Sequence, residues 1–247
     1  MIDLAEERLQ KVLSRSGFGS RRDCEKLIST GQVVVNHQVA VLGTKVDPQV
    51  DVIEVNGKRI TYSKPKEIII AFYKPQKVLS DIKKQDDRST VLDFVNVDGY
   101  LFIIGRLDYD SEGLILLTNN GDIANRLTHP RYEHEKEYRV LCSKTPDDSQ
   151  LEIWRRGVVI EEGVRTKPAI VERLIKEKDK LWLKVILKEG KKRQIREIGK
   201  AIGLPIKRII RIRIGTVRLG KLNPGEWRFL NPAEVERLKT STNQGNI

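Results

Sequence analysis

A short polar loop between two apolar stretches contains the residues best suited to nucleophilic chemistry. The segment 105–113, GRLDYDSEG, combines three acidic residues with one arginine and has a glycine at each end. Rigid strands joined by a charged loop are a common way to hold catalytic groups. A cationic neighbour can also keep one carboxylate ionised and oriented. By composition alone, however, the commoner outcome for such a segment is a solvated acidic turn.

Two basic segments follow further along the chain. Segment 188–196, KEGKKRQIR, predicts a strand end, a basic turn and a helix start, which suit phosphate binding. In segment 207–214, KRIIRIRI, Arg211 and Arg213 alternate with isoleucines and predict a basic stripe on a half-buried strand. Each patch alone is equally open to interpretation as a solvated face. Together with a formal net charge of +12 they favour a nucleic acid over an anionic membrane.

Other classes of site are not indicated. The chain has no signal-peptide apolar region and no apolar run near the roughly 18 residues of a spanning helix, so we expect a soluble, cytoplasmic protein. Cys24 and Cys142 lack a CxxC spacing and are interpreted as buried thiols. His37, His129 and His134 lack metal-ligand spacing and are expected on the surface or in loops. We therefore expect no metal and no cofactor.

The first part of the chain predicts a compact basic α-plus-β module. Apolar spacing indicates a helix within 8–17 and a second after Ser20, which forms a capping box with Asp23 and precedes a stop at Gly31. Hairpins are expected around 36–37 and within 50–60. The polar segment 62–66 contains a proline and is the predicted domain boundary.

The rest of the chain predicts a strand-rich α+β domain with a mixed, mainly antiparallel sheet. One helix is expected to be capped by Asp122, and another covers 194–202 and ends before Gly203. The tail 240–247 is expected to be disordered. The expected strands are 68–73, 100–104, 114–118, 137–142 and 181–187.

Four ordered motifs give this chain a family resemblance. GRLDYDSEGLILLTNNGD at 105–122 resembles the signature of pseudouridine synthases of the RsuA/RluB branch. YKP at 73–75, EKEYRV at 135–140 and EGKKRQIR at 189–196 are similar to the other elements of that family, in the same order. The segment from ERLQKVL through VVVNHQV is similar to the S-four-type RNA-binding domain of this branch. The resemblance therefore covers nearly the whole chain.

This resemblance implies two domains and a catalytic set. Residues 5–63 would form the RNA-binding domain and 66–240 the synthase domain. Asp108 is implied as the nucleophile, held ionised by an ion pair with Arg196. Tyr138 is implied to stack on the uracil and is a candidate to help remove the proton from carbon-5, although an ordinary tyrosine pKa makes it a poor base.

The implied RNA contacts fall into two groups. Leu107 and Ile195 are candidate apolar walls of the uracil pocket, although plain core packing explains both equally well. Residues implied to bind the substrate are Arg106, Leu107, Lys74, Arg193, Gln194 and Ile195. Residues expected to contact RNA are Arg15, Arg21, Arg22, Lys26, Arg211 and Arg213.

The expected activity is isomerisation of one uridine of ribosomal RNA to pseudouridine, in the large-subunit RNA by first preference and in the small-subunit RNA as the alternative. The target base must lie in a loop or be flipped out. A non-catalytic RNA-binding or ribosome-assembly protein is the principal alternative, and a DNA-binding regulator lacks a recognition helix. The expected partner is ribosomal RNA or an assembly intermediate, and the expected state is a monomer.

The chain departs from the family pattern at two places. Lys77 stands where the family usually has glycine, and because lysine resists positive φ the loop conformation is expected to change there. Glu197 and Ile198 stand where arginine and methionine are usual, and this change is expected to affect mainly the helix surface.

Overall fold

The computed structural model describes residues 6–61, 66–82, 86–174 and 182–243. The chain divides into two compact units, one of residues 1–67 with 97–101 and one of residues 68–96 with 102–247. Four residues of the predicted boundary, 62–65, lie outside the described residues. The domain limits 5–63 and 66–240 therefore stay a prediction. Within the described residues, no helix has both the length and the apolar character needed to cross a membrane.

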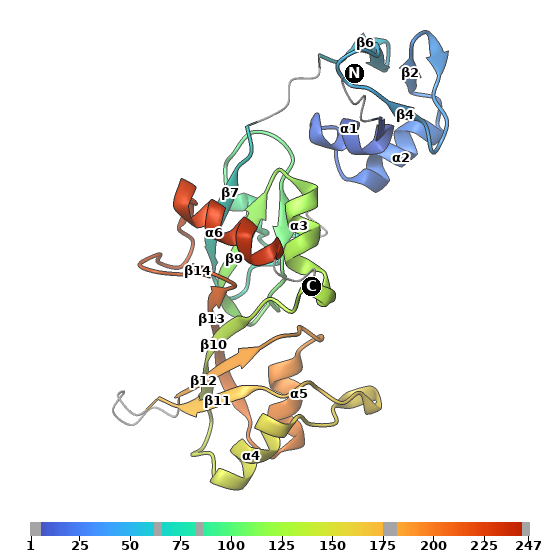
Figure 1. Cartoon of the computed structure of the whole chain (residues 1–247). Coiled ribbons are helices and arrows are strands. Elements are labelled where there is room, and N and C mark those ends of the chain that lie inside the picture. Colours follow the sequence, from blue (N-terminus) through green and yellow to red (C-terminus); the bar gives the residue numbers. More distant parts are fainter. Residues whose placement is uncertain (1–5, 62–65, 83–85, 175–181, 244–247) are drawn as a thin grey trace. The chain divides into compact units, whose positions relative to one another are not determined.

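The first unit has two short helices packed together over a small sheet (Figure 1). The capping box that opens the second helix is confirmed, because the Asp23 amide donates to Ser20 Oγ at 3.2 Å and the Ser20 amide donates to Asp23 Oδ2 at 2.9 Å. Gly31 has φ 73° and ends this helix, as predicted. The buried residues Leu9, Val12, Leu13, Cys24 and Ile28 form the helical side of the core. The helices are α1 Leu9–Arg15 and α2 Arg21–Ser29.

Both predicted hairpins of this unit are present. Asn36 and His37 have φ 48° and 65°, and Asn56 has φ 52°, the left-handed conformation that tight two-residue hairpins require. The four-stranded sheet has the order β3-β2-β5-β6, and β1 pairs with β4 separately. The strands are β1 Glu7–Arg8, β2 Val33–Val35, β3 Gln38–Val39, β4 Lys45–Val46, β5 Ile53–Val55 and β6 Lys58–Arg59.

The second unit is built on one large mixed sheet, which confirms the predicted fold class. Its strand order is β11-β12-β10-β13-β9-β7-β15, with β14 on β13 and β8 on β9. The strand pair β9 and β13 is parallel, and the other strand pairings of this sheet are antiparallel. The strands are β7 Ile69–Lys74, β8 Phe102–Ile104, β9 Glu112–Thr118, β10 Lys136–Cys142, β11 Ile170–Arg173, β12 Trp182–Leu187, β13 Ile206–Ile214, β14 Val217–Arg218 and β15 Trp227–Phe229.

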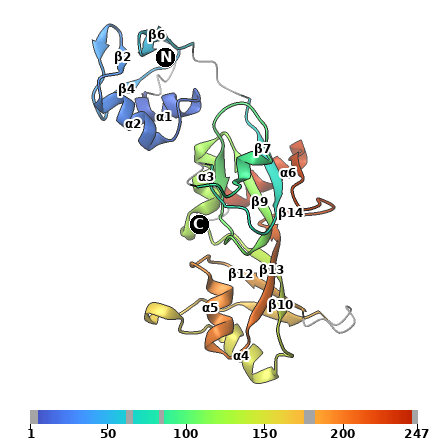
Figure 2. The same cartoon turned by 180° about the vertical axis from the view of Figure 1, so that it is seen from behind.

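Helices cover the two ends of this sheet and leave its middle for the loops (Figures 1 and 2). Helix α3 packs on β8, β9 and α6, whereas α4 contacts β11 and α5 contacts β13. The α-helices are α3 Gly121–Thr128, α4 Asp148–Arg156, α5 Gln194–Ala201 and α6 Pro232–Asn243. Short 3-10 turns cover Val91–Asp93, Pro130–Tyr132 and Glu161–Gly163.

The five predicted strands of this unit are present, but the helix predictions need three corrections. Asn120, not Asp122, caps α3, because its side chain accepts from the amides of residues 122 and 123. Helix α4 was not predicted; its segment is polar except for a few residues, of which Leu151 and Trp154 are buried one turn apart. Helix α6 continues to residue 243, so the predicted disorder from 240 is wrong for 240–243, and 244–247 lie outside the described residues.

The parallel pairing of β9 with β13 depends on one glycine. Gly113 lies opposite Arg211 in the ladder and has φ 106°. A Cβ atom at this position would come within 2.3 Å of the Arg211 carbonyl oxygen and 2.6 Å of its amide nitrogen. Glycine is therefore needed for the two backbones to approach, and this approach places the polar loop 105–111 beside β13.

Candidate active site

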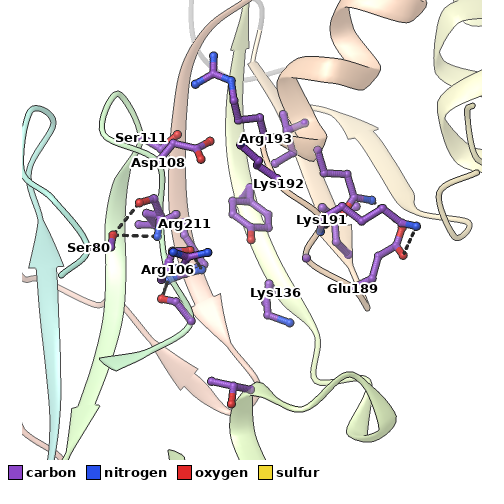
Figure 3. A pocket seen from close by; sticks show the side chains of 18 of the residues that line it. Ser80, Arg106, Asp108, Ser111, Lys136, Glu189, Lys191, Lys192, Arg193 and Arg211 are labelled. Carbon is purple, nitrogen blue, oxygen red and sulfur yellow. Dashed lines mark hydrogen bonds and ion pairs between the residues drawn. The ribbon is translucent and has the colours of Figure 1, made fainter. Parts of the chain in front are cut away.

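A pocket of about 770 Å³ lies at the middle of the large sheet and belongs entirely to the second unit. Its walls are the loop 105–109 after β8, the segment 127–136 that leads into β10, and the loop 188–195 between β12 and α5. Residues 79–81 and two side chains of β13 complete the lining. Figure 3 shows that charged side chains from these walls face one another. The motifs at 105–122, 135–140 and 189–196 therefore all contribute residues to this pocket.

The polar loop is held from below by a buried arginine. Arg211 is 1% exposed, and its guanidinium donates to the carbonyl oxygens of Leu114 at 2.7 Å, Gly105 at 2.8 Å and Arg106 at 3.2 Å. Ser80 Oγ adds a second support, because it donates to the Leu107 carbonyl at 2.6 Å and accepts from the Leu107 amide at 3.0 Å. These contacts fix the backbone on both sides of residue 107.

The three acids of the loop have different environments. Asp110 forms an ion pair with Lys77 at 2.5 Å, and Glu112 is buried and forms an ion pair with Arg208 at 2.5 Å. Asp108 lines the pocket and, within the described residues, its carboxylate has no hydrogen bond or ion pair. Asp108 is therefore the carboxylate of the loop that is available to a substrate.

Lys77 keeps a backbone conformation that is usual for glycine. Its φ is 63°, so the expected change of loop conformation does not occur. The Lys77 amide donates to the Tyr109 carbonyl at 2.8 Å, and its ammonium lies 5.1 Å from the centre of the Tyr109 ring. The side chain thus adds contacts to the polar loop that glycine lacks. The ion pair with Lys77 holds the pKa of Asp110 below its usual value.

The pocket has an apolar and aromatic part that fits a flat base. Tyr138 on β10 is 7% exposed and lies opposite Arg211 of β13 in the ladder. Leu107 and Ile195, the two candidate walls, line the same pocket with 8% and 5% exposure. Aromatic rings that are buried on one side of a cavity are suited to stacking on bases.

Arg196 does not have the predicted partner. Its guanidinium donates to the backbone carbonyl oxygens of Ile206 at 3.2 Å and Asp110 at 3.3 Å, not to the carboxylate of Asp108. The residue is placed under the loop because it lies in the first turn of α5, which packs against β13. The ion pair of Arg196 with Asp108 is therefore corrected to a backbone tether two residues further along. Ile198, in the next turn, is 1% exposed and belongs to the core, not to the helix surface.

The predicted substrate contact of Lys74 also needs correction. Lys74 is fully buried and does not line the pocket; its ammonium donates to the carbonyl oxygens of Pro75 at 2.7 Å and Val78 at 2.8 Å. Burial, opposed by the nearby Glu112 and Asp108, lowers its pKa to about 8. Lys74 therefore supports the turn before the pocket.

The predicted basic stripe on β13 is not exposed. Arg211 is buried under the polar loop, as described above. Arg213 donates to Glu137 Oε2 at 2.8 Å and to Glu135 Oε2 at 3.0 Å, and its side chain is 13% exposed. The strand alternates as predicted, but these two arginines do not form an exposed stripe, because backbone carbonyl oxygens of the loop 105–114 hold Arg211 and two glutamates hold Arg213.

The remaining predicted substrate residues lie in the pocket lining with different degrees of freedom. Arg106 and Arg193 are exposed and line the pocket. Gln194 is 4% exposed; its side chain donates to Glu189 Oε1 at 2.7 Å and accepts from the Lys191 amide at 3.0 Å. Gln194 therefore shapes the basic loop from within.

Sequence reasoning missed several lining residues. His134, expected on the surface or in a loop, is in a loop but only 8% exposed, and burial lowers its pKa. Ser80 had no recognisable signal, because it acts through contacts 27 residues away. Lys136 stands inside the quoted motif EKEYRV, two residues before Tyr138, and that alternation was the available signal.

In the first unit, the four residues that were expected to contact RNA differ in exposure. Arg21, Arg22 and Lys26 are exposed on α2. Arg15, which was also expected to contact RNA, forms an ion pair with Glu7 and has a side chain only 19% exposed. The unit therefore presents its exposed predicted cations on one helix.

Two further expectations concern groups outside the pocket. Both cysteines are buried, as predicted, and burial raises the pKa of each thiol to about 11. The described part of the chain contains no group of three histidine, cysteine or acidic side chains arranged to hold a metal ion.

Comparison with family models finds two matches along the chain. The model described as RNA pseudouridylate synthase matches residues 60–199, which is more than half of the chain. The model described as S4 domain matches residues 7–52. The first match contains the pocket loops 105–109, 127–136 and 188–195.

Comparison with known proteins gives relatives over almost the whole length. A protein of Aquifex aeolicus named "uncharacterized RNA pseudouridine synthase" is 39% identical over 95% of this chain and 94% of its own. The "ribosomal large subunit pseudouridine synthase B" of Bacillus subtilis is 39% identical over 97% of this chain and 98% of its own. A crystal structure of pseudouridylate synthase has a TM-score of 0.66 at 28% identity and covers 94% of this chain and 99% of its own.

Proposed function

The chain belongs to the RNA pseudouridylate synthase family, with an S4 domain before the synthase region, and we propose that it isomerises one uridine of large-subunit ribosomal RNA with Asp108 as the nucleophile. The observation that carries this proposal is the carboxylate of Asp108, which has no ion pair or hydrogen bond among the described residues and lies in a pocket with an aromatic wall. Its neighbours Asp110 and Glu112 form ion pairs with Lys77 and Arg208. A binding protein has no need for one free carboxylate inside a basic pocket.

The reaction follows from this arrangement. Asp108 attacks carbon-1 of the ribose with an electron pair, and the bond from that carbon to the base nitrogen breaks. The base turns in the pocket, its carbon-5 joins the ribose carbon, and the bond to Asp108 breaks. Carbon-5 then loses its proton, for which Tyr138 is the proposed carrier and also the stacking surface. The base nitrogen that left the ribose takes up a proton, so that the product is an isomer of the substrate. The loop needs little movement, because Arg211 and Ser80 already fix its backbone.

The rest of the pocket fits a nucleotide removed from a helix. A volume of about 770 Å³ accommodates a flipped nucleotide, and unstacking it costs a few kcal/mol that stacking and phosphate contacts must offset. Arg106 and Arg193 are exposed at the lining and are suited to the phosphates on either side.

Ribosomal RNA of the large subunit is proposed as substrate because a relative that aligns with 97% of this chain is named ribosomal large subunit pseudouridine synthase B. A second relative of the same name, from Salmonella typhimurium, is 38% identical over 94% of this chain. Arg21, Arg22 and Lys26 of the S4 domain are proposed to grip the structured RNA around the target. We also propose that the enzyme acts in the cytoplasm, as a monomer, on the RNA or on an assembly particle.

The test is a pseudouridine map of ribosomal RNA from cells that lack this protein, complemented with wild type or with Asp108→Ala. One large-subunit site should be lost and should return with wild type alone. A lost site in small-subunit RNA would move the substrate but keep the enzyme. An unchanged map, or rescue by Asp108→Ala, would leave only RNA binding.

A further inference from the structure

Two cations line the pocket and have no acidic partner among the described residues. Lys136 donates from its ammonium to the carbonyl oxygen of His134 at 3.2 Å. Arg211 donates to the backbone carbonyl oxygens of Leu114, Arg106 and Gly105, and its side chain also has a hydrogen-bond contact with Tyr138. Neither takes part in an ion pair in the described parts of the chain, although at least fourteen other lysines and arginines there do. Arg211 is buried and Lys136 is half-buried, and a cation without an acidic partner in such a place is costly and needs a reason.

Both cations flank the ring that is proposed to hold the base. Lys136 and Tyr138 are two residues apart on β10 and both line the pocket. Arg211 is the ladder partner of Tyr138 on β13. In the view of Figure 3, Arg211 lies between Asp108 and Lys136. A base that stacks on Tyr138 while its ribose faces Asp108 therefore has the two cations beside it.

We propose that Lys136 is a catalytic residue that stabilises the negative charge on the uracil when its bond to ribose breaks, with Arg211 as a positioning residue behind it. This inference rests on the proposed function. When Asp108 attacks the ribose carbon, the electron pair of the broken bond goes to the base, which becomes an anion on its nitrogen and carbonyl oxygens. Carbon-5 then forms the new bond, Asp108 leaves as a carboxylate and the base becomes neutral. Loss of the carbon-5 proton makes the base an anion once more, until its free nitrogen takes up a proton. A fixed cation lowers the energy of this intermediate stage without itself transferring a proton.

The electrostatic environment of Lys136 supports this role. Burial, followed by repulsion from Arg211, lowers its pKa to about 8. The free pocket therefore holds the Lys136 ammonium against an opposing field, and an anion in the pocket removes that penalty. An attraction between fixed charges is several times stronger in such a place than in water. The ionisable groups around it are Arg211 from β13, Tyr138 on its own strand, His134 from the preceding loop, Lys188 and Glu189 from the loop after β12, and Asp108.

A structural role for Lys136 makes a different prediction. If the residue served only to bind the His134 carbonyl, arginine would replace it without changing any pH dependence, and methionine would mainly lower stability. If its charge acts on the base, the rate must follow the ionisation of this residue. Arginine stays charged at every practical pH, so the two variants separate charge from shape.

The experiment uses full-length enzyme and a large-subunit RNA transcript carrying tritium at carbon-5 of its uridines. Tritium release is measured in single turnovers with saturating enzyme, RNA affinity is measured separately, and kcat/KM is followed from pH 6.5 to 9.5. The variants are Lys136→Met and Lys136→Arg. Lys144→Met is the matched control, because Lys144 is exposed and outside the pocket lining. Wild type and Asp108→Ala establish first that release depends on the nucleophile.

We expect Lys136→Met to lower the single-turnover rate by about 10²-fold with RNA affinity nearly unchanged. Lys136→Arg should recover much of the rate, and Lys144→Met should match wild type. In wild type, kcat/KM should fall as the pH rises through about 8, and in Lys136→Arg this fall should be absent. The pH comparison needs only wild type and Lys136→Arg, so it holds even if the methionine variant folds poorly.

Other results would overturn the proposal in recognisable ways. Wild-type rates in folded Lys136→Met, or the same alkaline fall in Lys136→Arg as in wild type, would show that the charge of Lys136 does not act on the reaction. If wild type itself released no tritium that depends on Asp108, the proposed function would fail, whereas the first two results leave it standing.

Discussion

Asp108, Asp110 and Glu112 carry the same functional group within five positions of one loop but differ in what surrounds them. Glu112 is 3% exposed and accepts hydrogen bonds from Arg208, at 2.5 and 3.0 Å, and from the Tyr73 hydroxyl at 3.1 Å. Burial and then the Glu112 charge raise the pKa of Tyr73 to about 12. At the scale of the residue, partners decide which acid is structural and which is free to react.

Glu112→Gln should therefore destabilise the fold and lower the pKa of Tyr73. Loss of the charge removes the ion pair with Arg208, and we expect the free energy of unfolding to fall by about 1–3 kcal/mol. The pKa of Tyr73 should move down from about 12, because the Glu112 charge, which is one of the three causes that raise it, is gone. Urea unfolding measures the first effect, and tyrosine absorbance between pH 9 and 12 measures the second. An unchanged tyrosine titration would contradict the assigned contact. Asp110→Asn, which alters an exposed ion pair, is the matched control.

Lys74 gives a prediction for the pH dependence of stability. Its pKa is about 8 in the folded protein and about 10.5 when unfolded, so between these values the unfolded chain binds a proton that the folded chain does not. Its contribution to stability is therefore lowest below pH 8 and increases as the pH rises toward 10.5. The stability of wild type minus that of Lys74→Met should grow by roughly 2 kcal/mol over this range. Denaturation at pH 7, 8, 9 and 10 tests this, with the exposed Lys144→Met, for which no such growth is expected, as reference.

At the scale of the element, the site depends on the contact between β9 and β13. This parallel pair brings together the loop that ends at Glu112 and the strand that supplies Arg208 and Arg211. No hairpin connects the two strands, since 87 residues separate Thr118 from Ile206 by sequence order. The site thus forms only when distant parts of the chain have paired.

Gly113→Ala should disturb this pairing more than an ordinary glycine substitution. Its Cβ would meet the Arg211 backbone at 2.3 Å, and φ of 106° is unfavourable for alanine. We expect a loss of about 3 kcal/mol or more in the free energy of unfolding, as for other substitutions at strained backbone positions. Gly190→Ala is the control, because nothing lies within 4 Å of its added Cβ and its φ is not positive. Equal melting temperatures for the two variants would show that β13 can move away from β9 at little cost.

At the scale of the whole molecule, catalysis and RNA binding are proposed for different units. Every residue that lines the pocket lies between 79 and 211, outside the S4 match at 7–52. The net charge of +12 is shared along the chain, and the exposed cations of α2 have no part in the pocket. Binding and catalysis should therefore respond to different substitutions.

The double variant Arg21→Ala/Arg22→Ala should weaken RNA binding and leave the chemical step intact. Each lost phosphate contact should lower the slope of log affinity against log salt by about 0.7–0.9. The single-turnover rate at saturating enzyme should stay within about two-fold of wild type, since no pocket residue changes. Lys58→Ala/Arg59→Ala removes the same charge from β6 of the same unit and should change the salt slope less. Equal slopes for both double variants would mean that the unit binds RNA by its net charge and not through α2.

Local patterns in the sequence were enough for most elements and for the residue that is proposed as the nucleophile. The capping box at Ser20, the hairpin turns at 36–37 and 56–57, the strands and the helix at 194 depend on neighbouring residues, and each is present in the structure. The ordered motifs indicated Asp108 and Tyr138, and both line one pocket.

The tertiary structure alone decided what the charged side chains do. Arg211 and Arg213 look alike in an alternating strand, yet one is buried under the loop of residues 105–114 and the other forms ion pairs with Glu135 and Glu137. Lys74, Arg196 and Lys136 likewise have partners that depend on which distant backbone carbonyls come within reach. Periodicity reports which face of an element is apolar, but a cation is assigned its role by the atoms that surround it, and those come from remote parts of the chain.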